Sequence, residues 1–406
     1  AGATGLERSE LHLVTPRVGG GFGGKAGMQH EYTVVVLAAK RLGRAVRWIP
    51  TRTEDMQSKD HSRGQVQYAE VGCRSDGTFT GLRVRLVGDG GAYPGIGAAL
   101  PGGTRRMSHG TYDFPAIDFD VAVAVTNTPP TGAYRGAGRP EATALLERLV
   151  DQAARELGID PIELREKNLL GDDVFPFETH TGNVYDSGRY RMPLRAAAEL
   201  IGYDELRTEQ ERRRASGAAE QLGIGVACYV EITGGGASPE FGKLEIHDDG
   251  SATMYCGTLS HGQGHQTTYA MLVSAQTGIP VDRITLVDGD TDRVPQGGGT
   301  GGSRSLQLGG SAVSEATGLV VERARDLAAR LLEADVADIV VDTAHGTIGV
   351  AGVPARSLGW GELAAQAREL DDQPLTADTI YHADGPSFPF GAHIAAVEVD
   401  TETGRS

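Results

Sequence analysis

The sequence predicts an α+β fold with two mixed α/β subdomains that contain hairpins, and three features support this class. Apolar and polar residues alternate over 65–92 and again over 241–257, and an Asp-Gly turn interrupts each stretch, as in an antiparallel hairpin. Residues 139–157 repeat apolar side chains at helical spacing. Strands and helices follow one another irregularly, which favours α+β over a doubly wound parallel sheet.

The remaining elements are predicted from the same patterns. In the first half we expect a strand at 11–18, a buried helix at 28–42, a strand at 45–52 and a short helix from Asp160 onward. In the second half we expect strands at 223–232 and 283–289 and helices at 266–277 and 311–333.

A polar, charged run separates these halves. Residues 205–221 contain few large apolar side chains, which is typical of a segment between domains. We therefore expect a first domain over 1–204, a linker over 205–221 and a second domain over 222–406.

Composition excludes several classes of protein. Acidic residues outnumber basic ones by 54 to 38 in 406 residues, and the formal charge is −16. Such a chain is a poor partner for a phosphate backbone, so we expect no nucleic-acid ligand. The sequence has no long apolar run and no secretory signal pattern, so we expect a cytoplasmic protein with no membrane span. Three isolated cysteines predict buried thiols rather than a disulfide framework.

Glycine is the compositional anomaly, because its 58 residues are about twice the usual share. The glycines gather in islands at 19–24, 86–103, 132–138 and 297–310. Such islands indicate loops where the backbone approaches a ligand closely or adopts positive φ, with ordinary tight turns as the alternative.

The first island also resembles a nucleotide-binding loop. Gly19, Gly24 and Lys25 fit the spacing of a phosphate-binding loop, whose backbone N–H groups bind anions. Ala26, however, stands where a serine or threonine must hold Mg²⁺, so a P-loop nucleotide binder is a weak alternative.

His261 and His265 have the i, i+4 spacing of a helical zinc pair. Gly262 and Gly264 between them disfavour a helix. We therefore expect no metal bound directly by side chains, and we interpret the segment as a polar loop that contacts a ligand.

Six segments, in this order, resemble the large subunits of molybdenum hydroxylases, the family of xanthine dehydrogenases, aldehyde oxidases and carbon monoxide dehydrogenases. They are VGGGFGGK (18–25), AYRGAGRPEA (133–142), LREKNLL (164–170), YDSG (185–188), GTLSHGQGHQT (257–267) and TGGSRSLQLGGSAV (300–313). The resemblance covers most of the chain. It implies a molybdopterin-binding fold of the aldehyde oxidase and xanthine dehydrogenase type.

The resemblance also implies which residues bind the molybdenum–molybdopterin cofactor. Around the metal it places Gly20, Gly21, Phe22, Gly23, Arg135, Gly136 and Ala137. At the pterin and its phosphate it places Gln263, Gly264, His265 and Thr267, and at the nucleotide end Thr300, Gly301, Ser303, Arg304 and Ser305. A large dianionic cofactor in an acidic protein needs many backbone donors and a few arginines, which these loops supply.

In function, the resemblance implies the molybdopterin-binding catalytic subunit of an oxidoreductase that hydroxylates an aldehyde or an N-heteroaromatic compound with water-derived oxygen. We expect the cytosine dinucleotide form of the pterin. The chain has no cysteine cluster and no Rossmann fingerprint, so [2Fe-2S] centres and FAD are expected on partner subunits, in a dimer of heterotrimers.

Two departures from the family pattern narrow the substrate. Carbon monoxide dehydrogenases carry a copper-binding cysteine in the loop after the arginine that matches Arg135, whereas this chain continues with Gly136, so carbon monoxide is disfavoured. Some xanthine-oxidising relatives have a carboxylate where this chain has Ala26, so a purine is less favoured.

No catalytic residue is assigned, because the family's general base is a glutamate near the C-terminus of the large subunit and nothing before Ser406 matches its motif. We therefore expect a fragment, or one part of a split subunit whose second chain supplies the base, that is inactive alone. A catalytically inactive scaffold or assembly subunit is the alternative, because it would also lack this glutamate.

Overall fold

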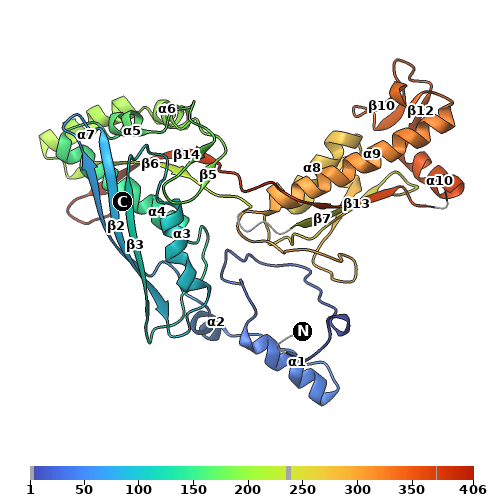
Figure 1. Ribbon diagram of the computed structural model, residues 1–406, viewed down its shortest axis with the longest axis horizontal. Helices are drawn as coiled ribbons and strands as arrows, with labels where there is room; N and C mark the ends of the chain where they lie inside the picture. Colours follow the sequence, from blue (N-terminus) through green and yellow to red (C-terminus); the bar gives the residue numbers. More distant parts are fainter. Residues whose placement is uncertain (1–3, 235–238, 372) are drawn as a thin grey trace. The chain divides into compact units, whose positions relative to one another are not determined.

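The computed structural model describes residues 4–234, 239–371 and 373–406, and the chain forms two compact units whose segments interleave. Unit 1 comprises residues 1–21, 27–48 and 233–386, and unit 2 comprises residues 22–26, 49–232 and 387–406. Each unit contains sheets and helices (Figure 1), and the predicted α+β class is confirmed. In the described part of the chain, no helix is both long and apolar enough to cross a membrane.

Unit 2 is built on a three-stranded sheet of β1 (Gln65–Cys73), β2 (Phe79–Gly91) and β3 (Ile117–Val125). β1 and β2 form the predicted antiparallel hairpin, and β3 runs parallel to β2. The crossover between β2 and β3 contains η2 (Ile96–Ala99) and α3 (Leu100–Met107). Helices α3 and α4 (Arg139–Leu157) pack against one face of the sheet, so alternate residues of β2 are buried. The helix predicted at 139–157 is thus confirmed.

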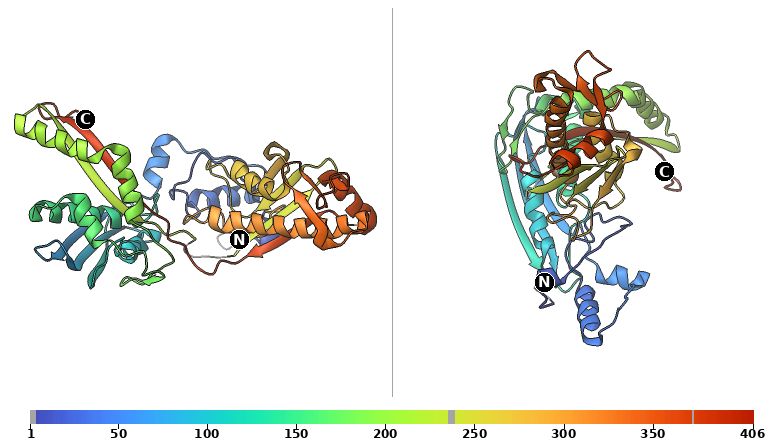
Figure 2. Two further views of the ribbon diagram at one scale, coloured as in Figure 1. Left: turned by 90° about the horizontal axis from the view of Figure 1, so that it is seen from above. Right: turned by 90° about the vertical axis from the view of Figure 1, so that its right-hand side faces the viewer.

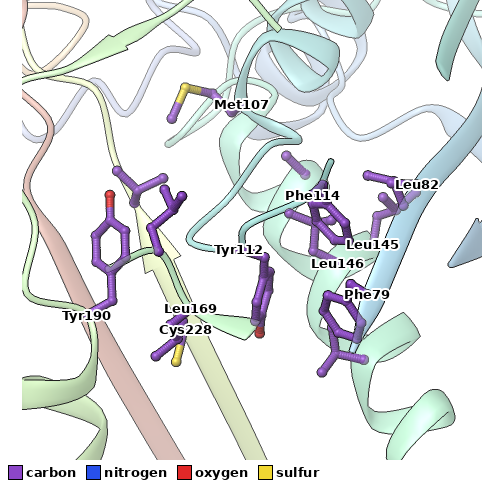
Figure 3. Packing of buried hydrophobic residues seen from close by; sticks show 14 of the residues in the cluster. Phe79, Leu82, Met107, Tyr112, Phe114, Leu145, Leu146, Leu169, Tyr190 and Cys228 are labelled. Atoms are coloured by element: carbon purple, nitrogen blue, oxygen red, sulfur yellow. The ribbon is translucent and has the colours of Figure 1, made fainter. Parts of the chain in front are cut away.

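Aromatic side chains fill the space between this sheet and its helices. The rings of Phe79 and Phe114 stack with their centroids 5.2 Å apart, and Tyr112 meets Phe79 edge-on at 5.7 Å. Figure 3 shows these rings beside Leu145 and Leu146 of α4. Such packing of large rings supplies the main apolar stabilisation of unit 2.

Most of the segment predicted to be a linker, 205–221, lies in regular structure. Helix α6 (Arg191–Ile201) is followed by α7 (Tyr203–Ser216) and then by β6 (Glu220–Val230). Tyr203 and Gln210 are buried, and the Gln210 amide donates to the Leu222 carbonyl at 2.7 Å. Two buried anchors therefore fix a helix whose sequence is otherwise polar.

The last described strand returns to unit 2. β14 (Phe390–Asp400) pairs antiparallel with β6, from Phe390 opposite Val230 to Asp400 opposite Glu220, and Figure 2 shows the two strands side by side. The chain thus leaves unit 2 after residue 232 and re-enters it at residue 387, so the compact units are not the two consecutive stretches expected from the sequence.

The YDSG motif at 185–188 holds this returning segment. β4 (Phe177–Glu178) and β5 (Val184–Tyr185) form a short hairpin, and the ring of Tyr185 lies 4.9 Å from that of Phe388. The Asp186 carboxylate accepts the backbone N–H of Phe388 at 2.9 Å. This motif, one of those that carried the family resemblance, therefore has a structural role in the fold.

A buried ion pair joins three elements of unit 2. The Arg165 guanidinium, on α5 (Pro161–Asn168), is fully buried and donates to Glu147 of α4 at 2.9 Å. Glu147 also accepts the Tyr112 hydroxyl at 2.7 Å and the Cys228 backbone N–H of β6 at 2.8 Å. Arg165 donates further to the Val226 carbonyl at 2.8 Å. These hydrogen bonds offset the cost of removing both charges from water.

Unit 1 is built on a four-stranded sheet in the order β13-β7-β8-β9. Its strands are β7 (Glu240–Ile246), β8 (Ala252–Cys256), β9 (Ile284–Val287) and β13 (Thr376–Tyr381). Helices α8 (His265–Thr277) and α9 (Ser311–Leu332) pack together on this sheet (Figure 1). The predicted helices at 266–277 and 311–333 and the predicted hairpin at 241–257 are confirmed.

A second, smaller layer packs against α9. It consists of the sheet β10 (Ile339–Asp342), β11 (Thr347–Val350) and β12 (Ser357–Gly359), followed by α10 (Trp360–Asp371). Ile348, Trp360 and Leu363 of this layer are buried in the same core as α8 and α9.

The N-terminal segment differs most from the prediction. Helix α1 (His30–Leu42) forms where a helix was predicted, but none of its residues is buried. The strand predicted at 11–18 is wrong, because only Val14 makes an isolated bridge, with Asp290. The strand predicted at 45–52 is also wrong, since α2 (Arg52–Ser58) begins there and the residues before it pair with no strand of the described chain. An extended pattern gives a strand only where a partner edge is available.

Removing the guanidinium of the buried pair should destabilise unit 2 strongly. We expect Arg165→Met to lower the free energy of unfolding by about 3–5 kcal/mol, because it leaves the Glu147 carboxylate buried without its counter-charge. The matched control is Arg195→Met, which breaks an ion pair with Glu166 whose arginine is 67% exposed and should cost less than about 1 kcal/mol. Urea unfolding measures both, and similar losses would contradict the assigned role.

Acid should destabilise the protein through His109. This side chain is fully buried among Phe114, Phe177 and Tyr185, and neither ring nitrogen has a hydrogen-bond partner among the described residues. Burial lowers the pKa of His109 from 6.5 to about 4. Because the folded pKa is the lower one, the stability that the neutral ring contributes is present above pH 6.5 and is lost as the pH falls toward 4.

Urea unfolding at pH 7 and pH 5 tests this assignment. Between these values we expect the His109 contribution to cost the native protein about 2 kcal/mol. The variant His109→Leu, which has no titrating ring, should lose that much less stability over the same range. An identical loss in both proteins would show that His109 is not the group responsible.

Candidate functional site

The residues predicted to bind a cofactor fall into two groups, one in each compact unit. Unit 2 contains Phe22, Gly23, Arg135, Gly136 and Ala137, and unit 1 contains Gly20, Gly21, Gln263, Gly264, His265, Thr267, Thr300, Gly301, Ser303, Arg304 and Ser305. Within each unit, segments far apart in sequence come together.

In unit 2, the first glycine loop lies against the arginine loop. The Arg135 backbone N–H donates to the Phe22 carbonyl at 2.7 Å, and the Arg135 guanidinium lies 5.1 Å from the centre of the Phe22 ring. Gly23 has φ +101°, and a Cβ there would lie 2.5 Å from the Ala133 carbonyl oxygen. Only glycine allows the two backbones to approach this closely.

The arginine loop contains three successive residues with positive φ, of which Ala137 is the strained one. Gly136, Ala137 and Gly138 have φ values of 96°, 47° and 99° in succession, and Gly138 begins α4. Glu141, in the first turn of α4, accepts the Gly138 N–H at 2.9 Å. The loop is therefore fixed to the helix that follows it.

Sequence reasoning missed the residue that holds this loop from the other side. Arg63 donates to Glu141 at 2.8 Å and to the backbone carbonyl of Arg135 at 2.5 Å, and its guanidinium lies 5.5 Å from the Tyr134 ring centre. An acidic residue at the third position of a helix is a known capping signal that could have indicated Glu141. Nothing in the sequence near Arg63 indicates its partner 72 residues away.

Left-handed backbone conformations gather in the predicted loops. Among the described residues, five non-glycine residues have positive φ, namely Phe22, Arg63, Ala137, Ser303 and Glu333. Three of them are predicted cofactor residues, and Arg63 contacts one of these loops. Such strain costs about 1–3 kcal/mol per residue and is typical of ligand-binding loops.

In unit 1, the loop 257–264 joins β8 to α8 and is held from both sides. Asp288 accepts the Ser260 N–H at 2.7 Å, and the Gln263 side chain accepts the His261 N–H. Gly21 lies against this loop, because a Cβ there would be 2.8 Å from His261 Nδ1. Gly264, with φ +83°, then begins α8.

His265, in the first turn of α8, is buried and stacks on Tyr269 with ring centroids 4.9 Å apart. Neither ring nitrogen has a hydrogen-bond partner among the described residues. Burial lowers the pKa of His265, and Asp288 opposes this shift. The imidazole is therefore held neutral beside the free N–H groups of a helix N-terminus, an arrangement that suits a polar or anionic ligand.

The loop 297–305 is the third part of the unit 1 group. The Thr300 hydroxyl donates to the Leu259 carbonyl at 2.6 Å and lies 3.0 Å from the Ser305 hydroxyl. Since Thr300 gives its hydrogen to a carbonyl, Ser305 must donate to Thr300. Both hydrogens are thus engaged, and the two oxygens keep lone pairs for donors of a ligand.

A buried carboxylate that the sequence did not indicate orients Arg304. Glu240 is fully buried at the start of β7. Its carboxylate accepts a hydrogen bond from the Arg304 guanidinium at 3.0 Å and another from the backbone N–H of Phe241 at 3.1 Å. Burial raises the pKa of Glu240 while the Arg304 guanidinium lowers it. Close packing requires glycine here too, because a Cβ on Gly257 would lie 2.1 Å from the Glu240 carboxylate.

The structure argues against the nucleotide-binding alternative. In a phosphate-binding loop the lysine opens the helix, but α1 begins at His30, well after Lys25. For the zinc alternative, His261 and His265 are joined by no third His, Cys, Asp or Glu side chain in an arrangement that could hold a metal ion, among residues 4–234, 239–371 and 373–406. The predicted cofactor residues thus lie in loops that offer backbone N–H groups, arginine side chains and a neutral imidazole. These donors fit a large anionic cofactor such as a molybdopterin.

The chain belongs to the molybdopterin cofactor-binding domain family. One family model matches residues 1–169 and a second matches residues 196–406, both described as molybdopterin cofactor-binding domains. The family resemblance drawn from the six sequence segments is therefore confirmed.

Among curated relatives, the carbon monoxide dehydrogenase large chain of Hydrogenophaga pseudoflava is 34% identical over 99% of this chain and 52% of its own length. The nicotine 6-hydroxylase large subunit of Paenarthrobacter nicotinovorans is 30% identical over 98% of this chain and 51% of its own. The chain thus spans about half the length of the curated relatives it matches.

Solved structures agree on the fold. Reconstituted CO dehydrogenase from Oligotropha carboxidovorans has a TM-score of 0.91 at 30% identity and covers 99% of this chain and 52% of its own. Quinoline 2-oxidoreductase from Pseudomonas putida 86 has a TM-score of 0.88 at 31% identity, covering 97% of this chain and 52% of its own.

The close backbone approach at Gly23 can be tested with a matched pair of glycines. Gly23 and Gly27 have similar positive φ values of 101° and 89°, but a Cβ on Gly27 meets nothing within 4 Å. Gly27→Ala should cost only backbone strain, about 1–2 kcal/mol of unfolding free energy. Gly23→Ala should cost about 1–3 kcal/mol more, because its Cβ overlaps the Ala133 carbonyl. Urea unfolding measures the loss of stability in both variants. Equal losses of unfolding free energy would refute the overlap between a Cβ at position 23 and the Ala133 carbonyl.

Proposed function

We propose that this chain is the molybdenum-cofactor-binding part of a hydroxylase that oxidises an aldehyde or an N-heteroaromatic compound with water-derived oxygen. The observation that carries this proposal is the clustering of left-handed backbone at Phe22, Ala137 and Ser303 in the three loops that match the family's cofactor segments. Strain of this kind persists only where a ligand or a tight framework needs it.

The groups available in each loop suggest how the cofactor is held. Arg135, which is exposed and whose guanidinium lies on the Phe22 ring, would supply positive charge to an anionic cofactor. His265, neutral and buried, offers one N–H donor and one acceptor at the start of α8. Thr300 and Ser305 offer acceptor oxygens, which suit the ring N–H and amino groups of a pterin better than its phosphate.

When bound, the molybdenum cofactor supplies oxygen transfer to carbon and accepts the two electrons of the oxidation. The residues of this chain would orient it and exclude water around it. No general base is assigned among them, since the sequence offers no match to the family's glutamate. We propose that another part of the longer protein, or a second chain, contributes that group.

The substrate proposal rests on the loop after Arg135. The neighbouring structures include a Cu,Mo-CO dehydrogenase, and the family's copper ligand is a cysteine in this loop. Here the loop continues with Gly136, Ala137 and Gly138, and the three cysteines lie elsewhere, in β1, β6 and β8. We therefore infer that carbon monoxide is not the substrate, in spite of the overall similarity.

The complete assembly is also part of the proposal. We infer that the pterin carries a cytosine nucleotide, that [2Fe-2S] centres and FAD reside on partner subunits, and that the complex is a cytoplasmic dimer of heterotrimers. The absence of a cysteine cluster and of a Rossmann fingerprint in this chain supports the placement of those centres on other subunits.

Metal and pterin analysis of the protein purified with its natural partners tests the function. We expect about one molybdenum per chain, a pterin cytosine dinucleotide on release and no stoichiometric copper, followed by turnover of an aldehyde or N-heterocycle. Molybdenum and pterin both absent from a folded complex, made in a host that synthesises the cofactor, would favour the scaffold alternative. Stoichiometric copper would overturn the substrate assignment.

A further inference from the structure

Tyr269 lies behind two of the loops proposed to bind the cofactor. It is buried in the second turn of α8, and its ring stacks on the imidazole of His265, with centroids 4.9 Å apart and planes 18° apart. Its hydroxyl reaches in the other direction and donates to the backbone carbonyl of Ser305 at 2.7 Å. One side chain thus touches the start of α8 and the end of the loop 297–305.

A short chain of hydrogen bonds fixes the orientation of that hydroxyl. The Thr258 hydroxyl lies 2.9 Å from the Tyr269 hydroxyl. Because Tyr269 gives its hydrogen to a carbonyl, Thr258 must donate to Tyr269. The Cys256 thiol lies 3.3 Å from the Thr258 hydroxyl and donates to the Gly309 carbonyl at 3.8 Å. The two hydroxyls thus donate in one direction, from Thr258 to Tyr269 and from Tyr269 to the Ser305 carbonyl.

This bond coincides with an irregular turn. Residues Ser305–Gly310 form a π-helical turn before α9, and such turns occur where a side chain inserts into the helical hydrogen-bond ladder. A Cβ on Gly309 would lie 2.6 Å from the Thr258 hydroxyl and 2.7 Å from the Tyr269 hydroxyl. The two hydroxyls therefore occupy the space that a side chain at 309 would need, which explains why glycine stands there.

We propose that Tyr269, supported by Thr258, is a positioning residue that couples His265 and the loop 297–305 into one rigid group of the proposed cofactor-binding residues of unit 1. Its ring sets the orientation of the His265 imidazole, and its hydroxyl sets the direction of the Ser305 carbonyl and of the hydroxyls beside it. This inference rests on the proposed function for its consequence, but the coupling itself is a property of the chain without any cofactor.

The first test measures the coupling without a cofactor. In the full-length protein prepared free of molybdenum and pterin, amide hydrogen exchange is compared between the native protein and Tyr269→Phe, which keeps the ring and removes the hydroxyl. We expect exchange over residues 300–310 to accelerate about tenfold, as loss of one buried hydrogen bond predicts. Tyr203→Phe is the matched control, because it removes a hydroxyl that hydrogen-bonds to Asp160 in unit 2 and should leave 300–310 unchanged.

The second test uses Thr258, where a conservative replacement is possible. Thr258→Ser keeps the donor hydroxyl, so amide exchange over residues 300–310 should match that of the native protein. Thr258→Val has nearly the same shape as threonine but lacks the hydroxyl. Its amide exchange should therefore accelerate as in Tyr269→Phe. The double variant with Tyr269→Phe should add little to either single change. Additive effects, or a serine variant as fast as the valine variant, would overturn the assigned chain.

The third test measures release of the cofactor from the loaded protein. We expect pterin to dissociate about tenfold faster from Tyr269→Phe and Thr258→Val than from the native protein, Thr258→Ser and Tyr203→Phe. Faster exchange in the cofactor-free protein with unchanged release would refute the positioning role while leaving the proposed function intact. A native protein that never contains pterin would refute the proposed function, and the first two tests would still decide the coupling.

Discussion

The buried contact between Glu147 and Arg165 is the constraint on which unit 2 depends. Two charges removed from water are tolerated only with full hydrogen bonding, and here the partners come from α4, α5, β6 and the Tyr112 segment. Each of these elements is therefore fixed relative to the others by groups that cannot leave the network without a large cost. The surrounding aromatic core of Phe79, Tyr112 and Phe114 supplies the apolar stabilisation that this network does not.

The consequence for the candidate site follows from the stiffness of α4. Its middle is anchored at Glu147, and its first turn carries Glu141, which holds Gly138 and Arg63. The loop that contains Arg135 is therefore strained between a fixed helix and a fixed guanidinium. Local preference alone would relax the positive φ of Ala137, so the tertiary framework maintains it.

In unit 1, the loops of the candidate site are held by other groups than in unit 2. The carboxylate of Glu240 orients Arg304, and the hydroxyls of Thr258 and Tyr269 orient the Ser305 carbonyl. In both units, glycines stand where a neighbouring backbone or hydroxyl already fills the position of a Cβ. The family segments thus divide in two, since LREKNLL and YDSG stabilise the fold whereas the glycine islands shape the loops.

The sequence by itself determined what depends on local pattern. The hairpin at 65–92, the helices at 139–157, 266–277 and 311–333 and the family itself could be predicted, because periodicity and glycine spacing are properties of adjacent residues.

Only the tertiary structure decided the rest. Most of the polar run at 205–221 lies in helix α7, which Tyr203 and Gln210 anchor, and the extended pattern at 11–18 pairs with another strand only at Val14. Arg63 and Glu240 entered the site through partners more than 60 residues away. Contacts between residues so far apart produce no periodic pattern in the sequence, because they form only when the fold brings distant segments together.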